Sequence, residues 1–119
     1  MERVQGIGGT FLRARDAATL RAWYAERLGV ELEEWGGQAF VNRDGDQTVW
    51  AVFAGDTDYF GARTQQWMLN YRVRDLEAML AQLRAAGAEV DDRVHEDENG
   101  RFGWGVDPEG NRFELWQPR

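Results

Sequence analysis

A short sequence pattern occurs twice in the chain and divides it into two similar halves. Arg13-Ala14-Arg15-Asp16 corresponds to Arg72-Val73-Arg74-Asp75, which begins 59 residues later. Each copy is followed by apolar residues at helical spacing and then by a glycine. A repeated order of elements is the mark of a duplicated architecture. The repeat predicts one domain over residues 1–119, built from modules at about residues 1–57 and 65–119.

Each repeated aspartate is expected to begin a helix. Asp16 and Asp75 can accept hydrogen bonds from the free amides of a first helical turn, and a following glycine can end the helix. Helices are therefore predicted over residues 17–28 and 76–86. Their apolar stripes, expected to lie in the core, are Leu20, Trp23, Tyr24 and Leu28 in the first helix and Leu76, Met79, Leu80 and Leu83 in the second.

Strands are expected on both sides of each helix. Short β-type runs separated by turn residues follow each helix, and Asp107-Pro108-Glu109-Gly110 fits a type I turn. The order βαβββ therefore occurs twice, which is typical of an α+β fold. The predicted strands cover residues 7–14, 30–35, 38–42 and 47–54 in the first module, and 66–73, 88–94, 101–106 and 112–116 in the second.

The composition excludes several classes of partner. Fourteen Lys and Arg against 21 Asp and Glu give a net charge of −7, which repels the phosphates of nucleic acids and anionic lipids. The absence of Cys excludes disulfides and thiolate zinc sites. Uncharged stretches are too short to span a membrane. We expect a cytoplasmic protein that binds neither nucleic acid nor membranes.

The chain resembles a known superfamily over essentially its whole length. The most specific motif is Asp-Pro-x-Gly-Asn-x-x-Glu-Leu at residues 107–115, and Trp23-Tyr24 and Leu28-Gly29 support it. The resemblance is to the vicinal-oxygen-chelate superfamily, which contains glyoxalase I, bleomycin-resistance proteins and extradiol dioxygenases. It implies that the two βαβββ modules form a half-open, barrel-like cleft, in which metal-dependent members bind a divalent ion.

The family's metal-ligand positions carry a single donor here. The resemblance places these positions at Gly9, Val49, Met68 and Glu114, and only Glu114 has a side chain that can bind a metal. One carboxylate cannot supply the several ligands that a divalent ion requires. The one histidine, His95, lies in an acidic segment that we expect to be a solvated loop. We therefore predict that the protein binds no metal and needs no cofactor.

Strand alternation indicates which residues face the cleft. On the strand at 66–73, we expect Trp67, Leu69, Tyr71 and Val73 to pack beneath the helix and the alternate residues to face the cleft. Apolar walls with a few polar groups suit a small organic ligand. The predicted ligand site consists of Phe11, Arg13, Met68, Asn70, Arg72, Glu114 and Trp116.

Two groups in this region allow a structural interpretation as well as a functional one. Glu114 either contacts a ligand or is a structural acceptor for Arg13, Arg72 or Asn70. A second aromatic group either packs within the sheets or lines a cleft mouth or a dimer interface. Its members are Phe60, Phe102 and Trp104.

The leading interpretation is a metal-independent small-molecule-binding protein of the bleomycin-resistance type. Its expected ligand is an aromatic or cationic organic compound, and its expected assembly is a homodimer. One alternative is a metal-dependent lyase, isomerase or dioxygenase of the same superfamily. The other is a protein-interaction scaffold that uses its tryptophan-rich surface. These residues leave open whether a reaction follows binding.

Overall fold

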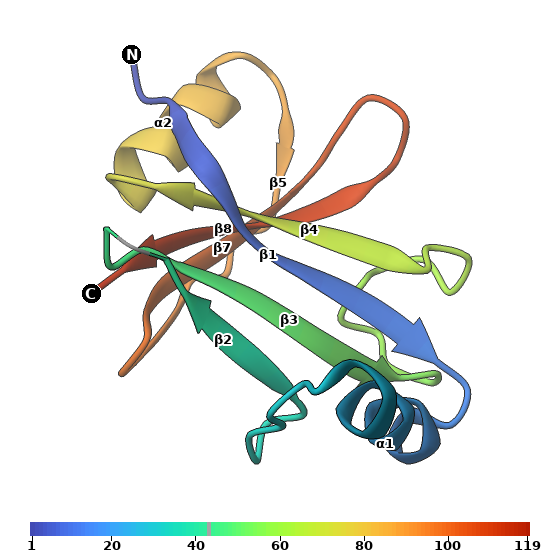
Figure 1. The fold of residues 1–119 in the computed structure, drawn as a ribbon. Helices are drawn as coiled ribbons and strands as arrows, with labels where there is room; N and C mark the ends of the chain where they lie inside the picture. Colours follow the sequence, from blue (N-terminus) through green and yellow to red (C-terminus); the bar gives the residue numbers. More distant parts are fainter. Residues whose placement is uncertain (43) are drawn as a thin grey trace. The chain divides into compact units, whose positions relative to one another are not determined.

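The fold is α+β, with two helices and eight strands in the part of the chain that the structure describes (Figure 1). The computed structural model describes residues 1–42 and 44–119, except for the side chains of Arg27 and Leu28. The predicted α+β fold class is confirmed. Neither of the two helices combines the length and the apolar character needed to cross a membrane.

The chain divides into two compact units. The N-terminal unit is Gly9–Trp67, and the C-terminal unit combines Met1–Gly8 with Met68–Arg119. Strand β1 (Val4–Ala14) therefore contributes residues to both units. The first eight residues belong with the second module, which the repeat alone does not indicate.

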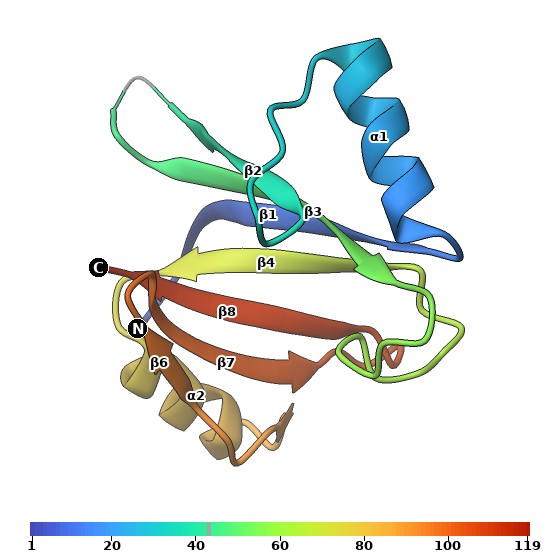
Figure 2. The same ribbon diagram turned by 90° about the horizontal axis from the view of Figure 1, so that it is seen from below.

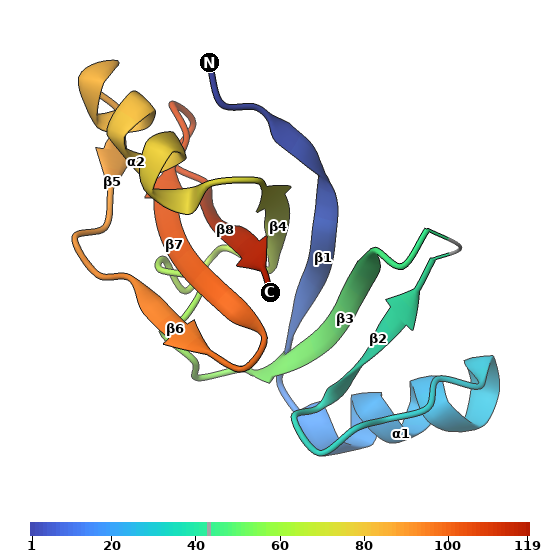
Figure 3. The same ribbon diagram turned by 90° about the vertical axis from the view of Figure 1, so that its left-hand side faces the viewer.

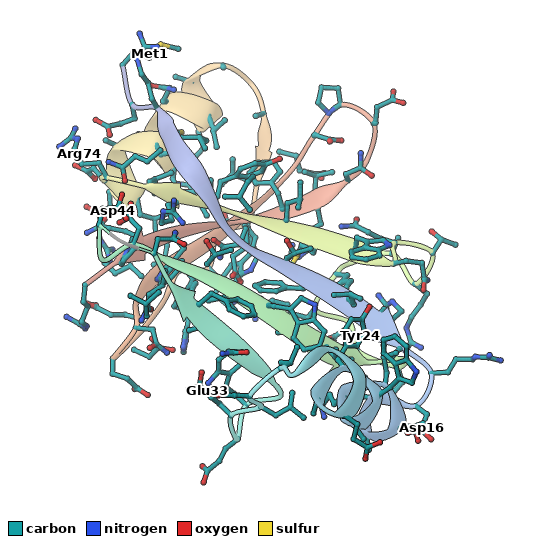
Figure 4. All side chains as sticks on the ribbon, viewed as in Figure 1. Met1, Asp16, Tyr24, Glu33, Asp44 and Arg74 are labelled. Atoms are coloured by element: carbon teal, nitrogen blue, oxygen red, sulfur yellow. The ribbon has the colours of Figure 1, made fainter. Side chains whose placement is uncertain are left out.

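The N-terminal unit contains three strands in the order β2-β3-β1. The C-terminal half of β1 runs parallel to β3 (Gln47–Ala54), and β2 (Gly37–Val41) pairs with the other edge of β3 in antiparallel orientation. Helix α1 (Ala17–Leu28) packs against β3 (Figure 3). The Asp16 carboxylate accepts a hydrogen bond from the Thr19 amide at 3.0 Å and begins this helix, as predicted (Figure 4).

Only part of the apolar stripe predicted for α1 faces β3. No described side chain of α1 is buried, and Trp23 is 49% exposed. Tyr24, a member of the predicted stripe, faces β3 together with Arg21. Arg21 Nη2 donates to the Val52 carbonyl at 2.5 Å, and the Tyr24 ring lies 4.8 Å from that of Trp50. Residues three apart share one face of a helix, so this pair turns Trp23 outward. The predicted stripe also included Leu28, whose side chain lies outside the described ones.

The strand predicted at residues 30–35 is absent. This segment instead forms a turn in which the Gly36 amide donates to the Glu33 carbonyl at 3.0 Å. The Glu33 carboxylate then accepts from the Ala39 amide of β2 at 3.1 Å. The Glu33 side chain thus satisfies the Ala39 amide of β2, which a neighbouring strand would otherwise have to satisfy.

The C-terminal unit contains a sheet with strand order β4-β8-β7-β5, and β6 also pairs with β7 (Figure 2). Strands β4 and β8 are parallel, while β7 is antiparallel to β8, β5 and β6. The strand predicted at residues 88–94 is shortened to Glu89–Val90, and a further short strand, His95–Asp97, lies in the segment predicted to be a loop. The elements are β4 (Trp67–Val73), α2 (Leu76–Ala85), β5 (Glu89–Val90), β6 (His95–Asp97), β7 (Gly100–Val106) and β8 (Arg112–Pro118).

The apolar stripe of α2 lies in the core, as predicted. Leu76, Met79 and Leu80 are buried against Val73 and Leu115, and Leu83 is partly buried beside them. Burying a side chain of this size contributes about 1.5–3 kcal/mol. This helix is the main apolar cover of the C-terminal sheet.

Only half of the β4 series predicted to pack beneath the helix does so. Tyr71 and Val73 belong to the α2 core, whereas Trp67 is 58% and Leu69 40% exposed. Helix α2 starts three residues after β4 ends and packs on β5, β7 and β8. It therefore covers the C-terminal end of β4 and leaves the side chains of Trp67 and Leu69, at the beginning of that strand, exposed.

The turn between β7 and β8 is organised by one carboxylate. Asp107 Oδ1 accepts from the amides of Glu109 and Asn111, both at 2.9 Å, and the Gly110 amide donates to the Asp107 carbonyl at 2.9 Å. Gly110 has φ of 88°, which favours glycine. These hydrogen bonds lower the pKa of Asp107 below its usual 3.8, and the bond from the Asn111 amide has the largest effect.

Asp107→Ala is expected to destabilise the protein at neutral pH and to have a smaller effect in acid. A carboxyl group with a lowered pKa stabilises the fold above its unfolded-state pKa, and this contribution is lost as the pH falls through its folded-state pKa. The difference between wild type and variant in urea unfolding should therefore shrink below about pH 4. Glu109→Ala, in the same turn, is the control. A difference that is equal at neutral and acid pH would contradict this account.

Candidate functional site

Three adjacent strands of the C-terminal unit place polar side chains at one level of the sheet. Glu114 of β8 is the register partner of Asn70 on β4 and of Trp104 on β7. Side chains of directly paired residues project from the same face of a sheet. The pairing therefore gathers a carboxylate, an amide and an indole at one place.

These three side chains form a buried hydrogen-bonded cluster, here called the Glu114 cluster. Asn70 Nδ2 donates to Glu114 Oε1 at 2.6 Å, and Trp104 Nε1 donates to Glu114 Oε2 at 3.0 Å. Asn70 and Glu114 are each only 2% exposed, and Trp104 is buried with them. A buried carboxylate is costly unless its oxygens accept hydrogen bonds, and donors of this kind supply them. Glu114 was predicted to accept a hydrogen bond from Arg13, Arg72 or Asn70, and the structure shows the one from Asn70.

The Asn70 side chain also carries a buried acceptor to which none of the described residues donates. Asn70 Oδ1 is buried and accepts no hydrogen bond from the described residues. It lies against Gly8, where an added Cβ would be 2.0 Å from Oδ1 and 2.9 Å from a ring carbon of Trp116. Glycine is therefore required at this position of β1, because any other residue would displace Asn70.

The other predicted site residues of this unit surround the cluster in different ways. Met68 and Trp116 are buried, and the Trp116 indole N–H donates to the Asn99 carbonyl at 3.0 Å. The Trp116 ring is nearly parallel to that of Phe102, with centroids 6.0 Å apart. Arg72 Nη1 donates to the Ile7 carbonyl at 2.7 Å.

The remaining predicted residues, Phe11 and Arg13, belong to the N-terminal unit. Arg13 donates to the carbonyls of Thr57 at 2.8 Å and Gly55 at 3.0 Å, and its Nε donates to the Gln65 carbonyl at 3.1 Å. Its guanidinium thereby holds the connection between β3 and β4. The Phe11 ring is buried, 5.2 Å from that of Phe53.

The second aromatic group is partly explained by packing. Phe60 is fully buried, with Arg13 over its ring at 5.1 Å. Trp104 is buried in the Glu114 cluster, while Phe102 is half-buried. For Phe60 and Trp104, the structure shows packing within a unit.

Sequence reasoning did not connect Trp104 with Glu114, although a signal exists. Val106 and Arg112 flank the β7–β8 turn as register partners, and antiparallel pairing outward from them leads to Trp104 and Glu114. Counting away from the turn motif would have found this pair. The pairing of β4 with β8 gives no comparable local signal, because these strands lie far apart in sequence.

The first-module counterpart of Glu114 is an apolar residue. Phe11 and Asn70 occupy equivalent places, each five residues before a helix cap, and their register partners are Ala51 and Glu114. The counterpart is therefore Ala51, two residues beyond the Val49 that an alignment of turns suggests. Neither residue can bind a metal.

The described residues do not fit a divalent metal centre of the superfamily type. Asn70 and Trp104 present N–H groups to Glu114, and an N–H group is a donor rather than a metal ligand. Residues 1–42 and 44–119 contain no group of three or more His, Cys, Asp or Glu side chains that could hold an ion. His95 is exposed, as predicted, but lies on β6 rather than in a loop, with Nε2 3.2 Å from the Asp97 carboxylate.

Comparison with known protein families gives a match to the glyoxalase-like domain over residues 9–116. The chain belongs to the glyoxalase-like domain family. This result, together with the fold, confirms the resemblance to the vicinal-oxygen-chelate superfamily. No curated protein matches the sequence significantly.

Several solved structures share the fold at low sequence identity. Methylmalonyl-CoA epimerase from Mycobacterium tuberculosis is 21% identical, with a TM-score of 0.69 over 98% of this chain and 89% of the epimerase. A Streptomyces coelicolor methylmalonyl-CoA epimerase variant in complex with 2-nitronate-propionyl-CoA is 16% identical, with a TM-score of 0.71 over 98% and 99%. A Legionella pneumophila structure described as NAD-dependent benzaldehyde dehydrogenase is 14% identical, with a TM-score of 0.62 over 93% and 98%. At these identities the likeness shows the fold alone.

Trp104→Phe is expected to destabilise the glyoxalase-like domain by about 1–3 kcal/mol, because it removes a donor from a buried carboxylate. Combining it with Glu114→Gln should give a coupling energy of about 1 kcal/mol in a double-mutant cycle of urea unfolding. Trp116→Phe is the matched control, since the Trp116 indole is equally buried but donates to a backbone carbonyl. Equal coupling of both tryptophans to Glu114 would contradict the assigned hydrogen bond.

Proposed function

We propose that this glyoxalase-like protein binds a small organic cation without a metal, as a member of the bleomycin-resistance type. The observation that carries the proposal is the composition of the Glu114 cluster. A buried carboxylate lies beside a buried amide oxygen that no described residue donates to. A ligand that brings N–H donors would complete this set of polar groups.

The surroundings of the cluster support an organic ligand with apolar surface. Met68 and Trp116 belong to the same unit and are buried and apolar. Apolar walls supply affinity, and a few polar groups orient the ligand. The net charge of −7 adds a long-range attraction for cations.

Metal independence is supported by the chemistry of the positions that relatives use for ligands. Gly9 and Met68 lack donor atoms suited to a divalent ion, and so do both residues considered as counterparts of Glu114, Val49 and Ala51. Glu114 itself accepts hydrogen bonds from Asn70 and Trp104. A cation with N–H groups can be bound by hydrogen-bond acceptors alone, whereas a divalent centre of the superfamily type needs several metal ligands, of which these positions supply only the Glu114 carboxylate.

We further propose a homodimer. The C-terminal unit exposes apolar side chains along β1 and β4, with Val4 48%, Ile7 42% and Leu69 40% exposed. Exposed apolar residues on neighbouring parts of one unit are typical of an interaction surface, and symmetric association is the commonest way to cover one.

A thermal-shift screen with bleomycin and small aromatic amines, each paired with an uncharged analogue, tests the proposed ligand class. Hits should be cations, and Glu114→Gln should weaken their binding about tenfold in calorimetry while changing that of neutral analogues little. Glu109→Gln, an exposed carboxylate on the β7–β8 turn, is the control and should leave affinity unchanged. Equal losses for cations and neutral analogues, or a screen without cationic hits, would contradict the proposal.

A further inference from the structure

Three arginines of the C-terminal unit converge on one aspartate. Arg93 and Arg112 place guanidinium nitrogens 3.8 and 3.5 Å from Asp91 Oδ2, and Arg84 donates to the Asp91 carbonyl at 3.1 Å. Arg84 lies in the last turn of α2, Arg93 between β5 and β6, and Arg112 at the start of β8. Such a gathering of positive charge is notable in a chain with a net charge of −7.

Two of these arginines are positioned by the same aromatic ring. The guanidinium carbons of Arg93 and Arg112 lie 4.9 and 5.6 Å from the ring centroid of Trp104. Guanidinium groups bind favourably over the face of an indole, which limits their motion. Trp104 is itself fixed by its hydrogen bond to Glu114. The ring therefore provides a rigid base for two planar, cationic donors.

Asp91 matches these donors poorly as a partner. Distances of 3.5 and 3.8 Å from Oδ2 are longer than the 2.7–2.9 Å of a good charge-assisted hydrogen bond. Asp91 is instead committed to the backbone, since its Oδ1 accepts from the Arg93 amide at 3.1 Å and its amide donates to the Trp104 carbonyl at 2.9 Å. The side chain of Arg93 is 65% exposed, so a solute can reach it.

We propose that Arg84, Arg93 and Arg112 form a binding site for a phosphate-type oxyanion, in which the Asp91 carboxylate competes with the anion. Each guanidinium presents several N–H groups in a planar fork that matches the oxygens of phosphate. The site recognises the anionic group alone or as part of a phosphorylated small molecule. It does not depend on the proposed binding of organic cations.

Inorganic phosphate, titrated against chloride at equal ionic strength, tests the site. The indole N–H resonance of Trp104, assigned by its loss in Trp104→Phe, should shift with phosphate and not with chloride. Arg93→Gln should weaken phosphate binding about tenfold, since one charged donor is lost. Asp91→Asn should strengthen it by a similar factor, because the amide can still accept from the Arg93 amide but no longer competes as an anion.

Arg74→Gln is the matched control. Arg74 belongs to the same unit, its side chain is 67% exposed, and its ion-pair partner is Glu2. Its replacement should leave phosphate affinity unchanged. Phenyl phosphate, titrated in parallel, should bind at least as tightly as inorganic phosphate, and tighter binding would identify an organic phosphate as the preferred form. Equal responses to phosphate and chloride, equal losses in Arg93→Gln and Arg74→Gln, or weaker binding in Asp91→Asn would overturn the proposal.

Discussion

Much of the structure of the C-terminal unit depends on the burial of one carboxylate, that of Glu114. Glu114 is 2% exposed, and such a group is tolerated only where donors surround it. Asn70 and Trp104 can reach it because β8 pairs with β4 and β7 in one register. A shift of one residue would turn Glu114 to the opposite face of the sheet. The Asp107 turn, which fixes where β8 begins, is thus part of the same arrangement.

The same constraint extends to residues that take no part in the hydrogen bonds. Gly8 has no side chain because Asn70 Oδ1 occupies the space of a Cβ. The guanidinium groups of Arg93 and Arg112 lie over the ring of Trp104, whose indole N–H donates to Glu114. The unit is therefore organised around a polar centre in addition to its apolar core beneath α2.

Features encoded by neighbouring residues were predictable from the sequence. The limits of α1 and β3 agree with expectation, because an aspartate cap, a glycine and turn residues lie beside these elements. Features that depend on distant partners were not. Trp23 is exposed because Arg21 reaches the carbonyl of Val52, 31 residues away. No local pattern distinguishes an arginine that faces a sheet from one that faces solvent.

In the candidate site too, some features follow from neighbouring residues and others depend on distant partners. Alternation along β4 and the turn motif identified Asn70 and Glu114, and the structure brings them together. Arg13 donates to carbonyls 42–52 residues further along the chain, and its predicted contact with a ligand stays a prediction. These carbonyl partners of Arg13 could not be predicted from the sequence, because they depend on the path of the connection after β3.

The central proposal is that Asn70 and Trp104, and not a divalent ion, satisfy the Glu114 carboxylate. Addition of Mn²⁺ to ¹⁵N-labelled protein tests this directly, because the bound paramagnetic ion broadens the resonances of nearby nuclei. The Trp104 indole N–H, which donates to Glu114 at 3.0 Å, is the reporter. The account predicts that its signal keeps its intensity at equimolar Mn²⁺. Selective broadening of this signal that Glu114→Gln abolishes would contradict it.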